Sequence, residues 1–284
     1  MKLHNTILMR PTILIIFISI VMSNLKAEII RPTEKAIIEI CYSKTVNRDT
    51  TRDDYMVTSP MILRIGDHGT MFFPKMTMNN DSLNYYNREL AIQVVIDALT
   101  KGLPVSSVLG HEHEYLFRNI NKQETMVYQA VGDEAFYYIE NTECPNWIIG
   151  EEMREINGMN CIEAHCSFHG REWTAWFAPE IPIKEGPWKL FGLLGLVIEA
   201  HDANCHYKFE VTGIRTENLA QVGIFIYDKL YPEKLNSRKD YLCRIYSLRI
   251  KGDFMKRVSS MTGNNVIHTN TDPYDFEETD YPHN

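Results

Sequence analysis

Short stretches in which apolar and polar residues alternate follow one another along most of the 284-residue chain. A period of two is typical of antiparallel strands with one buried face. The strands that this pattern predicts are 36–46, 61–65, 70–73, 114–118, 125–130, 135–140, 151–156, 159–168, 171–178, 196–200 and 205–212. The Gly-Asp-His-Gly run at 66–69 is expected to be the loop of a hairpin.

One segment has a helical period instead. Apolar residues recur at steps of three and four from Tyr86 to Leu99, which predicts a helix over 84–100 that ends at Lys101 and Gly102. Short sequential strands with one prominent helix predict a mainly β fold (β-rich α+β). We expect a curved antiparallel meander sheet or half-barrel packed with one or two helices. LolA/LolB-like periplasmic carriers use such an open half-barrel, an analogy of fold alone.

Residues 151–178 are expected to form a three-stranded meander. The dipeptides Asn-Gly at 157–158 and His-Gly at 169–170 separate alternating stretches and are typical two-residue hairpin turns. The second turn fixes the register, so that Cys166 lies opposite Trp173 on an apolar face. That face is expected to be the buried one.

The opposite face of the meander is polar and contains one large aromatic residue. It carries Glu163 and His165, with Trp176 on the neighbouring strand. These three side chains are candidate ligand-binding residues. The alternative is an ordinary solvated sheet face with scattered ion pairs.

The N-terminus has the pattern of a signal peptide. Lys2 and Arg10 are followed by an apolar run at 12–22 and by Ala27, a suitable residue for cleavage. The run is shorter than the roughly 20 residues that span a bilayer, so a membrane anchor is the less favoured alternative. We therefore predict export to the periplasm or beyond, with residues 1–27 removed.

Charge and tail composition limit the partners. Cleavage after Ala27 removes Lys2, Arg10 and Lys26 and changes the formal net charge from −8 to −11. An acidic chain is a poor candidate for binding nucleic acid or anionic lipid. Residues 28–269 are expected to form a single β-rich domain. Residues 270–284 are acidic and polar and are predicted to be a disordered tail.

Between the predicted strands 171–178 and 196–200, glycines and prolines stand among bulky apolar residues. Such a segment is a shaped connection and not a flexible linker. Its structural motif is expected to consist of Gly186, Pro187, Gly192 and Gly195.

Residues 147–213, which include this motif, resemble the GLPGLI family of secreted bacterial proteins. The signature's central proline is Leu194 here and its last isoleucine is Val197. The resemblance implies export and implies no reaction, and the family has no established catalytic or ligand-binding residues to carry over.

Aromatic residues gather around the same connection. Trp176, Trp188 and Phe191 are candidates to line an apolar groove where the sheet curves, which would suit a small hydrophobic molecule or a peptide. The alternative is that these side chains fill the core and cover strand edges.

Six cysteines follow the signal segment, at positions 41, 144, 161, 166, 205 and 243. In an oxidising compartment they would be able to form three disulfides, and the alternative is buried thiols. Cys161 and Cys166 are five positions apart on one predicted strand, so their side chains point to opposite faces and are not expected to pair with each other.

His111 and His113 are the candidate metal ligands. On a strand they would share one face and approach a zinc ion together with a third ligand. No nucleophile elbow, phosphate-binding loop or dinucleotide-binding motif occurs in the sequence, and no cofactor is predicted.

The sequence favours a non-enzymatic periplasmic protein that binds a hydrophobic ligand, a peptide or an outer-membrane partner. A metal-dependent hydrolase that uses His111 and His113 is one alternative. A structural or interaction protein that supports outer-membrane transport and docks through an edge strand is another.

Overall fold

The computed structural model describes residues 30–47, 56–131, 134–225, 231–249 and 276–281. The predicted signal segment at 1–27 lies outside the described residues. None of the described helices combines the length and the apolar character that crossing a membrane requires.

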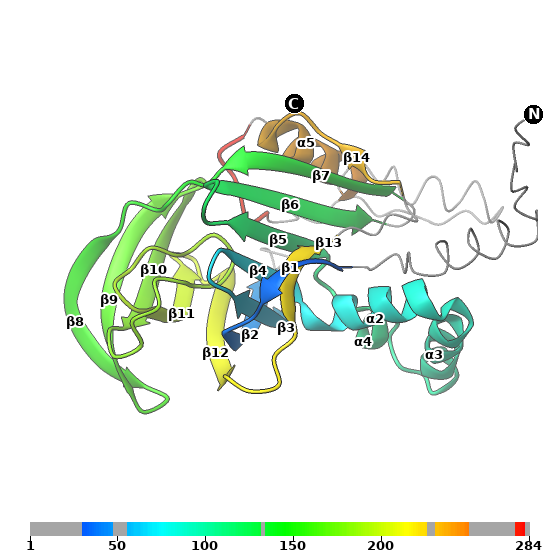
Figure 1. Ribbon diagram of the computed structural model, residues 1–284, viewed down its shortest axis with the longest axis horizontal. Coiled ribbons are helices and arrows are strands. Elements are labelled where there is room, and N and C mark those ends of the chain that lie inside the picture. The colour runs from blue at the N-terminus through cyan, green and yellow to red at the C-terminus, as the bar shows by residue number, and fades with distance from the viewer. Residues whose placement is uncertain (1–29, 48–55, 132–133, 226–230, 250–275, 282–284) are drawn as a thin grey trace, which may run out of the picture.

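Most strands belong to one large, strongly curved sheet (Figure 1). In spatial order its strands are β14 (Glu233–Lys234), β7 (Glu134–Asn141), β6 (Glu124–Val131), β5 (Glu114–Asn119), β4 (Gly69–Pro74), β3 (Met56–Ile65), β2 (Ile38–Asn47), β12 (Tyr207–Arg215), β11 (Leu196–Asp202), β10 (Arg171–Ala178), β9 (Met159–Phe168) and β8 (Ile148–Ile156). Neighbouring strands are antiparallel, except for the parallel pair β14–β7. The sheet is not closed into a barrel, and the predicted mainly β fold is confirmed.

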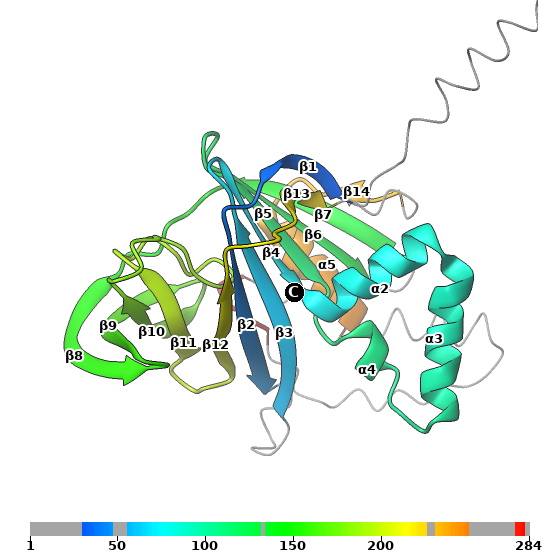
Figure 2. The same ribbon diagram turned by 60° about the horizontal axis from the view of Figure 1, so that its bottom comes forward.

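A two-stranded sheet of β1 (Ile30–Lys35) and β13 (Gln221–Phe225) lies across the larger sheet near β3, β4 and β5 (Figure 2). The larger sheet is therefore covered on two faces in this region. All six residues of β4 are buried, as expected for a strand that packs on both sides. Successive residues alternate between two cores: Ile62 belongs to the outer core, beneath β13, and Leu63 to the inner core, on the opposite face.

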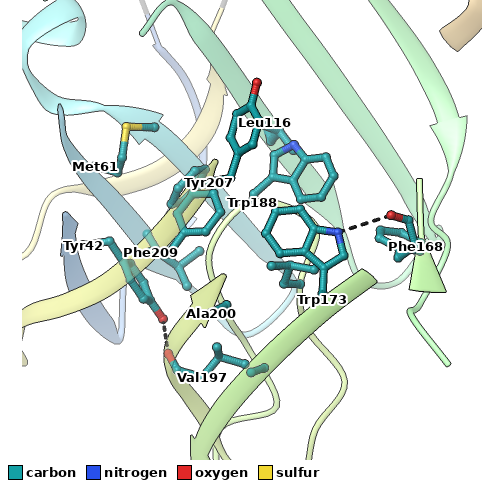
Figure 3. Packing of buried hydrophobic residues seen from close by; sticks show 14 of the residues in the cluster. Tyr42, Met61, Leu116, Phe168, Trp173, Trp188, Val197, Ala200, Tyr207 and Phe209 are labelled. Carbon is teal, nitrogen blue, oxygen red and sulfur yellow. Dashed lines mark hydrogen bonds between the residues drawn. The ribbon is translucent and has the colours of Figure 1, made fainter. Parts of the chain in front are cut away.

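Segments outside the strands also contribute side chains to the inner core. Residues 179–195 between β10 and β11 contribute Trp188, Leu190 and Leu193, and helix α5 (Arg238–Arg249) contributes Leu242 and Ile245. Trp173 lies between Trp188 and Phe209, with ring centroids 5.7 and 6.3 Å away (Figure 3).

The predicted meander is confirmed in register. Phe168 pairs with Arg171, and Cys166 pairs with Trp173 across β9 and β10. Trp173 is 1% exposed, as predicted for the apolar face. Its indole Nε1 donates to the carbonyl of Phe168 at 3.2 Å, so its polar atom is satisfied inside the core.

A single helix was predicted over 84–100, and the predicted start is wrong. The structure has α2 (Lys75–Tyr86) and α3 (Arg88–Thr100), which meet at Asn87, and a short α4 (Ser106–Leu109). The side chain of Asn87 accepts a hydrogen bond from the Leu90 amide at 3.1 Å and thereby caps α3. The predicted end is confirmed, because Gly102 adopts a φ of 70° just after α3.

The large apolar side chains of α3 are not the ones that the helix buries. Leu99 is 56% exposed, and Leu90, Ile92 and Ile96 are exposed as well. The helix instead buries the small side chains of Ala91 and Ala98, which allow close packing.

Two further expectations are corrected or decided by the structure. The tail at 270–284 was predicted to be disordered, yet its residues 276–281 are ordered, and Phe276, Glu278 and Tyr281 are buried. The rest of the tail lies outside the described residues. The six cysteines all lie within the described part of the chain and form no disulfide there.

Candidate binding site

Four basic side chains converge on the inner face of the sheet. Lys44 comes from β2, Arg171 from the start of β10, Lys189 from the connection 179–195, and Arg238 from the start of α5. The first three are buried. These four side chains define the ionic cleft. Since a buried cation is costly without a partner, the fold depends on how they are paired.

The first set of partners comes from the body of the protein. Lys44 Nζ lies 3.0 Å from Glu112, and Lys189 Nζ lies 2.8 Å from Glu140. Arg171 Nη1 lies 2.9 Å from Asp202 Oδ2.

The second set comes from residues 276–281, which lie beside α5 at the end of the described chain (Figure 1). Glu277 lies 2.7 Å from Lys44 Nζ. Glu278 lies 2.9 Å from Lys189 Nζ and also pairs with Arg238. Asp280 pairs with Arg238 as well. Each of the three acidic residues in the segment therefore forms an ion pair with a cation of the ionic cleft.

The backbone of this segment is bound too. Arg171 donates hydrogen bonds to the carbonyl oxygens of Phe276 and, at 3.1 Å, of Glu277. The Thr279 amide donates to the His169 carbonyl at 3.0 Å, and the Thr279 hydroxyl donates to the Gly170 carbonyl at 2.9 Å. One of these bonds joins main chain to main chain, and in the other three a side chain donates to a main-chain carbonyl oxygen.

The turn at 169–170 makes this approach possible. Gly170 has a φ of 83°, which favours glycine. A Cβ at this position would collide with Thr279 and with the amide of Asp280. The turn predicted from sequence thus also forms the docking edge for the segment.

Aromatic residues anchor both ends of the segment. The side chain of Phe276 is buried with its ring centroid 5.8 Å from that of Tyr246. Tyr281 is buried at the other end and belongs to the inner core. Buried aromatic side chains are typical anchors of a bound peptide.

A cavity of about 70 Å³ lies beside the segment and is lined by Lys44, Glu114, Tyr241 and Glu277, among others. The Tyr241 hydroxyl donates to Glu114 at 2.6 Å. Oε1 of Glu277 is buried and has no hydrogen-bond partner within the described residues. A polar cavity of this size is large enough to hold water, which is able to donate a hydrogen bond to a buried carboxylate oxygen such as Oε1 of Glu277.

Burial sets the protonation states around the cleft. It raises the pKa of Glu277 to about 7, although Lys44 opposes the shift. It lowers the pKa of His169 to about 4, although Glu278 opposes the shift. Burial also acts against the charge of Lys44, but the carboxylates of Glu112 and Glu277 outweigh it and raise the pKa of that lysine.

The connection 179–195 carries Lys189 into the cleft through tight backbone geometry. A Cβ on Gly186 would collide with the Leu190 carbonyl, and one on Gly195 with the Ala178 carbonyl. Gly192 has a φ of 99°, and Trp188 has a φ of 55°, which is uncommon for so large a residue. The motif glycines therefore lie where a close approach or a positive φ occurs.

The five predicted ligand-binding residues lie on both faces of the sheet. Trp188 fills the inner core and lines the cavity beside the ionic cleft. Phe191 lies 3.8 Å beneath the guanidinium of Arg118. Trp188 and Phe191 both line a cavity of about 20 Å³, which is small for an organic ligand.

Trp176, Glu163 and His165 were predicted to share the other face of the meander. The guanidinium of Arg154 covers the Trp176 ring at 4.1 Å. His165 Nε2 lies 3.1 Å from Glu163 Oε2, and the His165 side chain is 47% exposed. Trp176 pairs in register with Glu163, but its side chain is buried and belongs to the inner core, whereas the His165 side chain is partly exposed.

His111 and His113 precede β5, which begins at Glu114 as predicted, so the strand geometry that would place the two side chains on one face does not apply to them. His111 lines a cavity of about 220 Å³ near α4, whereas His113 lines the cavity beside the ionic cleft. Within the described residues, the group spaced to hold a metal ion is His169, Glu278 and Asp280. Its two carboxylates already pair with Arg238.

Sequence reasoning missed the four cations of the ionic cleft. The two strands, the connection and the helix that carry these cations are far apart in sequence. One signal was present: the acids of 276–281 lie between the aromatic residues Phe276 and Tyr281, a pattern that allows binding to a basic surface.

Comparison with known proteins gives distant likenesses. No family model matches the sequence. An A-type hemocyanin (units Ode to Odg) of Enteroctopus dofleini is 20% identical over 190 residues, which are 62% of this chain and 13% of that protein. A G-type hemocyanin (units Oda to Odg) of the same animal is 20% identical over 162 residues, which are 54% of this chain and 5% of that protein.

The chain thus spans 13% and 5% of the length of these curated relatives. Two solved structures of PNGF-II are similar to it. The C2 crystal form has a TM-score of 0.44 at 15% identity and covers 70% of this chain and 31% of that one. The P21 form has a TM-score of 0.45 at 14% identity and covers 72% and 32%.

Proposed function

We propose that this chain is an exported, non-enzymatic protein of the GLPGLI type that binds a peptide segment in the ionic cleft. The observation that carries the proposal is the way residues 276–281 lie in this cleft. They make side-chain ion pairs, main-chain hydrogen bonds and aromatic contacts at both ends, as a bound peptide does. The signal-like N-terminus and the family resemblance support export.

Peptide binding accounts for the site better than binding of a small hydrophobic molecule. The inner face is already packed by Trp188, Leu190 and Leu193. The groups that converge on the cleft are charged, and charged donors suit carboxylates and carbonyl oxygens. The metal-dependent hydrolase has less support, because His111 and His113 line different cavities.

The edge strand β8 favours a second candidate function, the docking of a partner strand. Ile148 is 71% exposed, and Ile149 and Met153 on the same strand are exposed too. An exposed edge strand with apolar side chains is a template for pairing with another chain. Replacement of Ile148 and Met153 by lysine is expected to abolish such docking and leave peptide binding in the cleft intact.

The primary proposal is tested by freeing the cleft within the full chain. In a Glu277→Ala/Glu278→Ala variant the resident segment loses its contacts with Lys44 and Lys189. A labelled peptide with the sequence of residues 275–282 is then titrated into the variant, and fluorescence anisotropy is recorded. We expect saturable binding with a Kd on the order of micromolar. Unchanged anisotropy, with the resident segment shown by limited proteolysis to be released, would refute peptide binding.

A further inference from the structure

Lysines of the ionic cleft pair both with the body of the protein and with residues 276–281. Lys44 pairs with Glu112 of the body and with Glu277 of the segment. Lys189 pairs in the same way with Glu140 and Glu278. When the segment leaves, each lysine therefore keeps one carboxylate, and the empty cleft does not contain an unpaired buried charge at these two positions.

Arg171 follows the same division. Its guanidinium pairs with Asp202 of the body and donates to two carbonyl oxygens of the segment. These two hydrogen bonds are made to the main chain of the segment, which every peptide sequence offers. Lys44, Lys189 and Arg238 instead contact carboxylates of the segment, so their contacts depend on its sequence. We call these three the charge-reading contacts.

The charge-reading contacts differ in how far their side chains are exposed to solvent. The side chains of Lys44 and Glu277 are 6% and 14% exposed, whereas those of Arg238 and Asp280 are 21% and 38% exposed. A neutral residue in place of Glu277 or Glu278 removes a carboxylate from a buried cation, and such losses are large. A neutral residue in place of Asp280 removes a pair closer to solvent, where ion pairs contribute less.

From this arrangement we infer that the cleft recognises a partner segment of one chemical class: a peptide with two adjacent acids, a third acid two positions later, and aromatic residues at both ends. The inference rests on the proposed function and adds the partner's chemistry. It also assigns a role to residues 276–281, which match this class and compete with the partner as the resident occupant. Their sequence is Phe-Glu-Glu-Thr-Asp-Tyr.

The competition follows from the connectivity of the chain. The resident segment is joined to α5 through residues 250–275, so it is present at the cleft at every protein concentration. A partner in trans must displace it. A substitution that weakens the binding of the resident segment to the cleft is therefore expected to increase the apparent affinity for the partner peptide.

The first experiment compares two peptides on the full-length Glu277→Ala/Glu278→Ala variant. One is Phe-Glu-Glu-Thr-Asp-Tyr, and the other is its uncharged isostere Phe-Gln-Gln-Thr-Asn-Tyr. We expect the acidic peptide to bind at least about 30-fold more tightly, because the isostere leaves buried cations without their second partners. Equal binding of the two would overturn charge recognition and leave peptide binding standing. No binding of either would overturn both proposals.

The second experiment exchanges the charge at the rim of the cleft. With Arg238→Glu added to the same variant, a peptide that has arginine in place of the aspartate is expected to bind about fivefold more tightly than the acidic peptide. An unchanged preference would show that this pair does not read the ligand. The full-length Asp280→Asn chain, in which the cleft is intact, provides a milder release of the resident segment if the double variant does not fold.

The third comparison tests the resident segment as competitor. The parent chain is expected to bind the acidic peptide at least about tenfold more weakly than the double variant. If both bind it with the same affinity while circular dichroism shows both folded, residues 276–281 do not compete for the cleft.

Discussion

Lys44 Nζ lies 2.7 Å from a carboxylate oxygen of Glu277, although the two residues are 233 positions apart in the chain. The same ammonium group lies 3.0 Å from Glu112 on the segment before β5. One buried side chain on β2 thus connects the body of the sheet with the end of the described chain. The stability of the fold and the occupancy of the cleft are coupled at this position.

Replacement of Lys44 by methionine is expected to cost about 3–5 kcal/mol in the free energy of unfolding, because Glu112 and Glu277 are left in a buried site without their cation. The matched control is Lys35→Met at an exposed position on β1, with an expected change within about 0.5 kcal/mol. Urea denaturation provides both values.

A double-mutant cycle isolates the pair of Lys44 and Glu277. The Lys44→Met/Glu277→Gln variant is expected to be more stable than the sum of the single effects predicts, by about 0.5–3 kcal/mol. Strict additivity would mean that the two side chains do not interact in solution.

Trp173→Ala is expected to cost about 3–5 kcal/mol, since the indole is 1% exposed and packs between Trp188 and Phe209. The control is Ile148→Ala on the exposed edge strand β8, which removes an apolar side chain that is 71% exposed. A change below about 1 kcal/mol for Trp173→Ala, with an equal change for the control, would contradict the observed burial.

The meander was predictable because local chemistry determines it. The turns at 157–158 and 169–170 require residues that tolerate positive φ, and two-residue turns fix the register of the strands on either side. The pairing of Cys166 with Trp173 follows directly from the second turn. Every strand predicted from alternation between 36 and 212 overlaps a strand of the structure.

The cleft was not predictable for the opposite reason. Lys44, Arg171, Lys189 and Arg238 are brought together by long-range strand order, which alternation alone does not reveal. The segment 276–281 was assigned to a disordered tail on its acidic composition. Composition predicts disorder only when the charges stay solvated, and here buried cations neutralise them.

The packing of α3 shows a similar limit. Helical spacing predicts that a helix forms, but it does not identify which residues of the helix are buried. The small residues Ala91 and Ala98 allow the closer contact and are the ones that are buried.

The cysteines are expected to differ in reactivity as free thiols. Burial raises the pKa of Cys161 to about 11 and that of Cys166 to about 12, so at neutral pH both remain protonated and poorly nucleophilic. Cys205 is exposed and serves as the reactive control. Alkylation with iodoacetamide, followed by peptide mass spectrometry, should label Cys205 first and the two buried thiols only in urea. Detection of either buried cysteine in a disulfide would contradict the structure.

The connection 179–195 is expected to respond to substitution according to its backbone geometry. Gly195→Val places side-chain atoms against the Ala178 carbonyl, and Gly192→Val forces a β-branched residue into a φ of 99°. Each is expected to cost about 3 kcal/mol and to lower the Tm by about 6–12 °C. Leu194 is 69% exposed, and Leu194→Pro, which introduces the proline of the signature that this segment resembles, is expected to shift the Tm by no more than about 2–4 °C. Melting of all three variants at the parent temperature would contradict a rigid connection.

Acid is expected to destabilise the protein through His169. Burial lowers the pKa of this side chain from its ordinary value of 6.5 to about 4. Between these two pH values the unfolded chain carries a proton on the ring and the folded chain does not. The contribution of His169 to stability is therefore fully present above pH 6.5 and is lost as the pH falls through 4.

A His169→Gln variant separates this effect from other titrating groups. Glu277, whose pKa is raised from 4.5 to about 7, contributes a slope of opposite sign, so that its contribution decreases as the pH rises through 7. Because Glu277 is present in both proteins, its slope cancels to first order in their difference. Between pH 7 and 4 the parent is expected to lose up to about 3 kcal/mol more than the variant in urea unfolding. Parallel stability curves would show that His169 titrates in the folded protein as it does in the unfolded chain.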